Sequence, residues 1–167
     1  MTQLEIVFEH VNKSALSELM PRMFEILQGN MNKIAPTGRS YEADYLEWYG
    51  NVYPAMQKAP RQMVAMRDRH GLFGFFQYYV NDGRFVMEEI QLQRKMQGKG
   101  VFEAFFRWLL PQLSDDVQWV EAYAHRENLK SQGILRHLGL ERIDSDETCA
   151  YLHFKGDFDT FYKCFFR

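Results

Sequence analysis

The chain has 167 residues and a mass of 19.9 kDa, which is enough for one domain that buries about 70% of the surface of its extended chain. Hydrophobic residues make up 46% of the sequence and charged residues 25%, which excludes the disordered, collagen-like and disulfide-scaffold classes. The 20 Lys and Arg against 22 Asp and Glu give a net charge of -2, so no positive excess is available to bind phosphate backbones, and nucleic acid is not an expected partner.

The two cysteines, Cys149 and Cys164, have no spacing typical of metal ligands. The N-terminal residues lack the basic and apolar regions of a signal peptide, and no uncharged apolar stretch is long enough to span a membrane. These features predict a cytoplasmic protein with no metal and no membrane partner. Aromatic residues make up 16% of the chain, which indicates that some of them line a pocket or a subunit interface, so a homodimer stays open.

Hydrophobic periodicity predicts one strand and two helices in the first third of the chain. The strand is expected over residues 4–8, and the first helix is expected to begin at Ser14 and to end at Gly29. A second helix is expected over residues 41–49, and Pro54 then interrupts the helical pattern.

The rest of the chain predicts a meander of three strands and then alternating helices and strands. The expected strands are 62–67, 72–80, 84–92, 117–124, 140–143 and 149–154, and the expected helices are 98–110 and 128–138. Glu103 and Arg107 are spaced to form an i,i+4 ion pair on the first of these helices. No repeat or linker interrupts the pattern, so the sequence predicts one mixed α/β domain over residues 1–167.

A short glycine-rich loop joins the third strand of the meander to the next helix. It reads Gln97-Gly98-Lys99-Gly100-Val101, and its backbone N–H groups, the helix dipole and the lysine ammonium favour an anion. The loop is neither a P-loop nor a complete dinucleotide fingerprint. A plain tight turn is the alternative interpretation.

Two segments of the chain resemble motifs of the GNAT superfamily of acyl-CoA-dependent N-acetyltransferases. The stretch from Glu88 to Gly100 is similar to the family's strand and Q/R-x-x-G-x-G/A signature, with Lys95 in the leading position. The stretch from Asn128 to Leu140 is similar to N-x-x-S/A-x-x-x-Y-x-x-x-G-F, with leucine in place of the tyrosine and of the phenylalanine.

This resemblance implies a GNAT-like fold with a central, mostly antiparallel, twisted sheet flanked by helices in the order β-α-α-β-β-β-α-β-α-β-β. It also implies an N-acetyltransferase that moves an acetyl group from acetyl-CoA, its cosubstrate, to a primary amine. A small amine is the expected acceptor. A CoA-binding sensor without turnover and a protein or peptide N-acetyltransferase are the alternatives.

By the same resemblance, the backbone of Ile90 and Leu92 is expected to pair with the pantetheine arm of the cofactor. The pyrophosphate is expected on the amides of Gln97, Gly98, Lys99, Gly100 and Val101. Asn128 and Ser131 are expected beside the other edge of the arm. For Asn128, capping of the following helix is an equally good interpretation, and it is compatible with contact to the cofactor.

Acetyl transfer needs a base, because an ammonium ion has no free lone pair at neutral pH. Strict alternation along residues 84–92 would place Glu88 and Glu89 on opposite faces of the strand, and at least one of them should face a cleft. Glu88 is the predicted base, on a resemblance to the serotonin and spermidine acetyltransferase branches. The alternative is a cross-strand ion pair of Glu88 with Arg67 or Arg69.

The leaving thiolate takes up a proton, and in much of the family a tyrosine at the position of Leu135 supplies it. Because leucine has no hydroxyl group, Tyr123 or a water molecule is expected to act instead. Tyr123 shares a predicted strand face with Trp119, Glu121 and His125.

The segment from Tyr41 to Tyr49 combines aromatic and acidic residues where variable helices of the family cover the substrate entrance. A site for a cationic amine is one interpretation. An amphipathic helix with its aromatic residues packed on the core is the stronger one.

Overall fold

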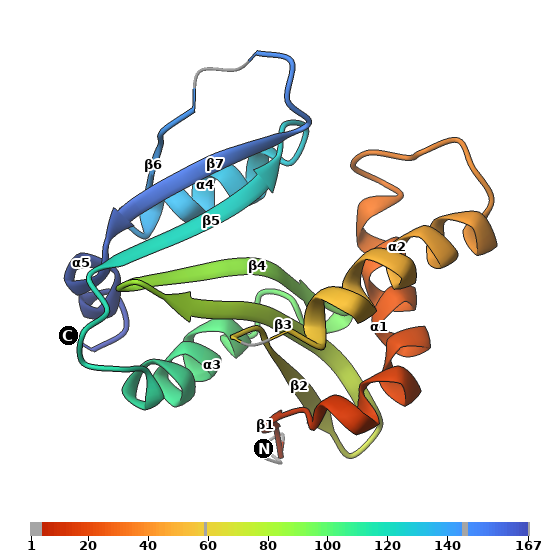
Figure 1. Cartoon of the computed structure of the whole chain (residues 1–167), viewed down its shortest axis with the longest axis horizontal. Coiled ribbons are helices and arrows are strands. Elements are labelled where there is room, and N and C mark those ends of the chain that lie inside the picture. Colours follow the sequence, from red (N-terminus) through yellow and green to blue (C-terminus); the bar gives the residue numbers. More distant parts are fainter. Residues whose placement is uncertain (1–4, 59, 145–146, 167) are drawn as a thin grey trace. The chain divides into compact units, whose positions relative to one another are not determined.

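The computed structural model in Figure 1 describes residues 5–58, 60–144 and 147–166. Within these residues, seven strands form one sheet in the order β1-β2-β3-β4-β5-β7-β6. The strands are β1 (Val7–His10), β2 (Gln62–Asp68), β3 (Gly71–Asn81), β4 (Arg84–Leu92), β5 (Trp119–His125), β6 (Glu141–Arg142) and β7 (Tyr151–Asp157). The helices are α1 (Leu16–Met31), α2 (Tyr41–Met56), α3 (Val101–Leu109), α4 (Leu129–His137) and α5 (Phe158–Lys163), with 3-10 turns at Lys13–Ala15, Arg94–Met96 and Leu110–Gln112.

The chain divides into two compact units. The first unit comprises Met1–Gln77 and Glu89–Lys99, and the second comprises Tyr78–Glu88 and Gly100–Arg167. The strands β3 and β4 therefore each contribute residues to both units.

The predicted order of elements is confirmed, with α5 added in the aromatic tail, but two predicted helix ends are wrong. Gly29 and Pro54 both lie inside helices, in α1 and α2. A glycine inside a helix costs about 1 kcal/mol, which the burial of Met20 and Met23 on the same helix offsets. The start of the first predicted strand lies partly outside the described residues, and β1 begins at Val7.

The core of the first unit forms where α1 and α2 pack against the sheet. Its fully buried members come from both helices and from β2 and β3, and they are Leu16, Met20, Met23, Met56, Met63 and Phe75. Trp48 of α2 packs edge-on against Phe75, with 6.5 Å between the ring centroids. This contact fixes α2 on the face of β3 that Phe75 occupies.

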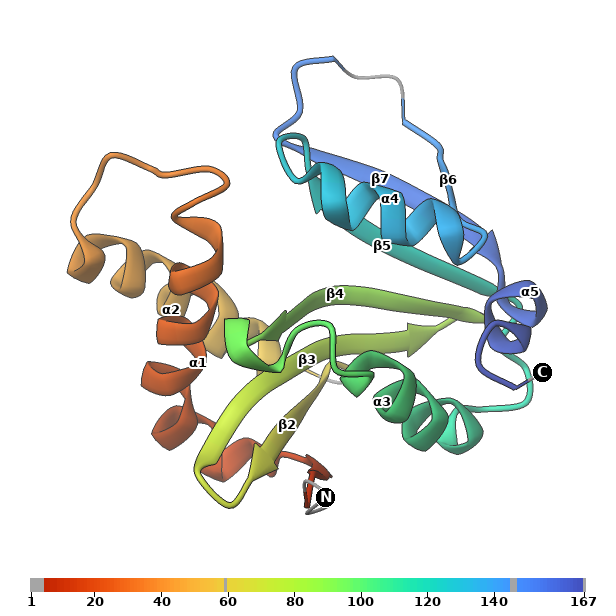
Figure 2. The same ribbon diagram turned by 180° about the vertical axis from the view of Figure 1, so that it is seen from behind.

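The core of the second unit is built largely from phenylalanine rings. Phe85 of β4 contacts Phe161 of α5 edge-on at 6.3 Å, and Phe106 of α3 contacts the same ring at 5.4 Å. The helix α4 lies along β5 and β7, as Figure 2 shows from behind. The predicted pair of Glu103 and Arg107 is present on α3, with 2.9 Å between the charged atoms.

The strand β4 carries one residue more than its partner β3. Asp82 and Gly83, both at positive φ, form a two-residue hairpin turn, and simple counting from this turn would pair Phe73 with Leu92. Instead, the N–H of Gln93 donates to the carbonyl of Phe73 at 2.7 Å. An extra residue in one strand is a β-bulge, and side chains after it change faces relative to strict alternation.

The close approach of β3 and β4 predicts that position 74 does not tolerate a side chain larger than that of glycine. A Cβ atom there would lie 2.8 Å from the carbonyl oxygen of Gln91 and 2.8 Å from a methyl carbon of Leu92. We expect Gly74→Ala to lower the free energy of unfolding by about 1–3 kcal/mol, measured by urea denaturation. Gly29→Ala is the control, because nothing lies within 4 Å of its Cβ position and a helical Gly→Ala change stabilises by about 0.5–1 kcal/mol. Equal stability of Gly74→Ala and wild type would contradict the close approach.

Alkaline unfolding is predicted to depend on Tyr78, which is buried and contacts Phe85 edge-on at 5.7 Å. Burial raises the pKa of Tyr78 from 10.0 to about 12. The folded state therefore favours the neutral phenol, and this contribution to stability is complete below pH 10 and is lost as the pH rises towards 12. When urea denaturation at pH 8 and pH 11 is compared, we expect the loss of stability to be smaller in Tyr78→Phe than in wild type by about 1.4 kcal/mol. An identical loss in both proteins would contradict the prediction.

Candidate functional site

The glycine-rich loop leads into the N-terminus of α3 without a side-chain cap. Gly98 and Gly100 have φ of 75° and 77°, a region in which only glycine is unstrained. Nothing lies within 4 Å of either Cβ position, so their backbone conformation requires glycine and the space beside them is open. Gly100 is the N-cap of α3 and supplies no side-chain acceptor, whereas the side chain of Asn128 caps α4. The first-turn N–H groups of α3 therefore suit an external anion.

Hydrogen bonds at the end of β4 engage some of the backbone groups that were expected to bind the cofactor. The N–H of Gln97 donates to the carbonyl of Arg94 at 3.1 Å. The carbonyl of Leu92 accepts from the side-chain amides of Asn30 at 2.8 Å and of Gln97 at 3.0 Å. In this structure the loop therefore offers amides from Gly98 onward, and Leu92 offers its N–H rather than its carbonyl.

The direction of the Leu92 N–H follows from its neighbour. Because the N–H of Gln93 donates to β3, and successive residues of a strand direct their N–H groups to opposite edges, the N–H of Leu92 points away from β3. The parallel register of β4 with β5 pairs Arg84 with Trp119 and continues to Met87 with Ala122. Ile90 and Leu92 lie beyond these four pairs.

The start of α4 agrees with the capping interpretation of Asn128. Its side-chain oxygen accepts the N–H of Ser131 at 3.1 Å, which satisfies one first-turn donor of the helix. Leu135 lies on the same helix with only 9% of its surface exposed. An apolar residue therefore occupies the position where the family motif has tyrosine.

The second unit contains a buried carboxylate with two polar partners. Glu121 of β5 is 4% exposed, and its Oε2 lies 3.2 Å from a guanidinium nitrogen of Arg84 on β4. Its Oε1 lies 2.8 Å from Nε2 of His153 on β7. The imidazole of His153 in turn stacks on the ring of Tyr123, with 4.5 Å between centroids and 11° between the planes.

Tyr123 is held in its protonated form by its surroundings. Burial raises the pKa of its phenol, the neighbouring Tyr79, Glu121 and Glu88 raise it further, and Arg84 opposes them. The influence of Glu88 means that the predicted base and the predicted acid lie near one another in the second unit. A phenol that stays protonated at neutral pH can donate a proton to a leaving group.

Glu89 belongs to a different polar network, in the first unit. Its Oε1 accepts from the side-chain amide of Gln91 at 2.6 Å, and the carbonyl oxygen of that amide accepts from Asn30 of α1 at 2.9 Å. Glu89 and Gln91 are two residues apart and contact each other, which agrees with the predicted alternation of faces at these two positions. The alternative partners named for Glu88 have other contacts, because Arg67 pairs with Glu9 at 2.9 Å and Arg69 donates to His70 at 3.2 Å.

The segment from Tyr41 to Tyr49 packs as an amphipathic helix. Phe24 of α1 contacts the rings of Tyr41, Tyr45 and Trp48 at 5.1–5.4 Å between centroids. Two acidic residues of the helix, Asp44 and Glu47, form ion pairs with Arg39 at 3.5 and 2.7 Å. These contacts confirm that the helix packs through its aromatic residues.

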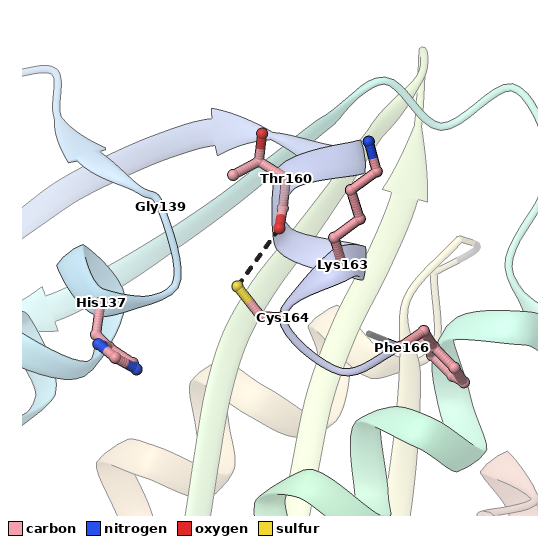
Figure 3. A pocket seen from close by; sticks show the side chains of 6 residues that line it. All are labelled: His137, Gly139, Thr160, Lys163, Cys164 and Phe166. Atoms are coloured by element: carbon pink, nitrogen blue, oxygen red, sulfur yellow. Dashed lines mark hydrogen bonds between the residues drawn. The ribbon is translucent and has the colours of Figure 1, made fainter.

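A separate open hollow of about 550 Å³ lies between the end of α4 and α5 (Figure 3). It is lined by His137, Gly139, Thr160, Lys163, Cys164 and Phe166. The Sγ of Cys164 donates to the carbonyl of Thr160 at 3.4 Å. No residue expected to bind the cofactor or to act in catalysis is among these lining residues.

In the described part of the chain, every helix is too short or too polar to traverse a lipid bilayer.

The architecture matches solved structures along almost the whole chain. The PaiA N-acetyltransferase from Thermoplasma acidophilum, solved in complex with coenzyme A, is 14% identical and aligns over 92% of this chain and 99% of its own, with a TM-score of 0.72. The chain has the fold of the GNAT N-acetyltransferases. An acetyltransferase from Thermus thermophilus shares this fold at a TM-score of 0.70 and 14% identity, over 94% of this chain and 99% of that one.

Mutant forms of the spermidine/spermine N-acetyltransferase SpeG from Vibrio cholerae also share the GNAT fold. They are 12% identical, with a TM-score of 0.60 over 96% of this chain and 98% of theirs. No family model and no curated protein matches the sequence.

The sequence alone missed His153 as part of the candidate site. The signal was present in the pattern of β7, where His153 alternates with buried Leu152 and Phe154. Its partner Glu121 is 32 residues away in the sequence, and only the antiparallel pairing of Tyr123 with His153 brings the two strands into register.

Proposed function

We propose that the protein transfers an acetyl group from acetyl-CoA to the primary amine of a small molecule in the cytoplasm. The observation that carries this proposal is the loop of positive-φ glycines before an uncapped α3, in a chain with the GNAT fold. The PaiA enzyme of that fold was solved with coenzyme A, and SpeG is named for its polyamine acceptors. Both support the choice of cosubstrate and acceptor.

The residues at the loop fit the chemical groups of acetyl-CoA. The N–H groups of Gly98 to Val101 and the ammonium of Lys99 suit the pyrophosphate. The outward N–H of Leu92 and the backbone of Ile90 suit the amide groups of the pantetheine arm, and Asn128 with Ser131 suits its other edge. When bound, acetyl-CoA supplies a thioester, which is the electrophile for the amine.

Glu88 and Tyr123 are the proposed acid–base groups. Glu88 removes a proton from the amine, directly or through water, so that the nitrogen lone pair can attack the thioester. Tyr123 donates a proton to the departing sulfur, a role open to it because its phenol stays protonated at neutral pH. The N–H of Ile90 is the proposed donor to the thioester oxygen as negative charge develops there.

A CoA-binding protein without turnover is the second candidate. The buried Leu135, in place of the family's tyrosine, is the observation that favours it. Under this alternative, acetyl-CoA binds but no amine releases the thiol.

The role of Glu88 is tested by Glu88→Gln, which keeps the size of the side chain and removes the carboxylate. We expect thiol release from acetyl-CoA with a polyamine acceptor to fall about 100-fold or more, and CoA affinity measured by calorimetry to stay unchanged. Glu89→Gln is the matched control, because Glu89 contacts Gln91 in the first unit, and it should retain most of the activity.

Three outcomes separate the candidates. Activity that is lost only in Glu88→Gln supports the enzyme and the assignment of its base. Activity that is equal in both variants and wild type refutes Glu88 as the base. Tight CoA binding with no thiol release by wild type, across polyamines, amino acids, aminoglycosides and peptides, refutes the enzyme in favour of the CoA binder.

The loop is tested by Gly98→Ala and Gly100→Ala. Each substitution forces a non-glycine residue into positive φ, at a cost of about 1–2 kcal/mol, without any steric clash. We expect the affinity for CoA in calorimetry to fall about tenfold as the loop relaxes to another conformation. Gly50→Ala in α2, where nothing lies within 4 Å of the Cβ position, should leave the affinity unchanged. Equal affinity in all three variants would exclude the loop from the binding site.

A further inference from the structure

The proposed chemistry leaves one proton without an acceptor. A primary ammonium must lose two protons to become an amide nitrogen with a single hydrogen. One of these is balanced by the proton that the thiolate takes up as the C–S bond breaks and the C–N bond forms. Glu88 accounts for one removal, so a second proton acceptor near the same atoms would complete the balance.

His153 and Glu121 form the arrangement that a histidine base requires. The carboxylate of Glu121 is buried, and its Oε1 lies 2.8 Å from Nε2 of His153. Because an ionised carboxylate can only accept hydrogen bonds, Nε2 carries the hydrogen and Nδ1 carries the lone pair. A carboxylate that fixes one imidazole nitrogen as a donor makes the other nitrogen the base.

Arg84 gives this buried carboxylate a cationic partner. Its guanidinium lies 3.2 Å from the second oxygen of Glu121 and is itself partly exposed, with 37% of its side chain accessible. A buried carboxylate with no cationic partner would be costly. Arg84 and His153 thus each provide a partner for one oxygen of Glu121.

His153 lies close to Tyr123, the proposed acid. Its imidazole stacks on Tyr123 at 4.5 Å, and 25% of its side chain is accessible to solvent. The same phenol is influenced by the charge of Glu88. Solvent access gives the imidazole a route by which a proton can leave.

We propose that His153, oriented by Glu121, is the second proton acceptor of acetyl transfer. Glu88 takes one proton from the acceptor nitrogen and His153 takes the other through Nδ1, and one of these protons is released to solvent while the other restores Tyr123. This inference rests on the proposed function, since it assigns a residue to the same reaction.

Several charged groups face His153. On β5, Glu121 and the phenol of Tyr123 lie next to His153. On β4, Arg84 forms an ion pair with Glu121. After β6, Asp144 accepts the backbone N–H of His153, a hydrogen bond that holds the pKa of this carboxyl below its usual range. Arg142 pairs with Asp144 at 3.0 Å. The two carboxylates thus each have a guanidinium partner.

The test uses His153→Gln and Glu121→Gln in the full chain, with His137→Gln as the control. His137 lines the separate hollow of Figure 3. Thiol release from acetyl-CoA is measured with spermidine and with the other amines of the panel, from pH 5.5 to 9. We expect kcat to fall about 100-fold in His153→Gln, to fall by less in Glu121→Gln, and to be unchanged in His137→Gln. The limb of the wild-type pH profile that histidine protonation produces should be absent from His153→Gln.

A second variant separates a proton acceptor from a structural residue. In His153→Ala, added imidazole should restore part of the lost activity, because a free base can enter the space of the missing side chain. A residue that only supports the fold would not be replaced in this way.

The outcomes distinguish this inference from the function on which it rests. If wild type is active and His153→Gln has the same rate and the same acid limb of the pH profile, the role of His153 is overturned and the proposed function stands. Loss of activity without imidazole rescue and with an unchanged acid limb also overturns it, in favour of a structural role. No thiol release by wild type with any amine overturns the proposed function, and this inference falls with it.

Discussion

The hydrogen bonding of β4 is the constraint on which the candidate site depends. This strand pairs with β5 over four residues, from Arg84 to Met87. On its other side it lies beside β3 and has one residue more than β3. The N–H of Gln93 still reaches β3, so Leu92 directs its own polar groups to the other edge. Backbone polar groups at an uncovered strand edge need other hydrogen-bond partners. The side-chain amides of Asn30 and Gln97 are such partners for the carbonyl of Leu92.

A second constraint is the charge of the buried Glu121. Burying a carboxylate in a sheet is unfavourable unless each of its oxygens has a partner. Arg84 and His153 supply these partners from the two strands that flank β5. The cost of burial therefore orders three strands around one carboxylate, and it places an oriented imidazole beside Tyr123. Stability and proposed chemistry share the same contacts here.

Local sequence signals predicted the elements well but not their ends or their faces. Periodicity located the residues of β4, and the two glycines located the loop that follows it, where both have positive φ. Gly29 did not end α1, because the tertiary burial of Met20 and Met23 outweighs local propensity. The extra residue of β4 is not visible in the sequence, since a bulge depends on the pairing with another strand. Consequently alternation in the sequence does not fix how the faces of β4 relate to those of β3.

The contacts that could not be predicted all join residues that are distant in the sequence. Asn30 reaches Leu92 across 62 positions, and His153 reaches Glu121 across 32. Residue-resolved amide hydrogen exchange, with and without saturating CoA, tests the central claim that the backbone of β4 and the glycine loop binds this molecule. The account predicts slower exchange at Ile90, at Leu92 and through Gly98 to Val101. Protection confined to other segments, or no change in exchange at all, would contradict it.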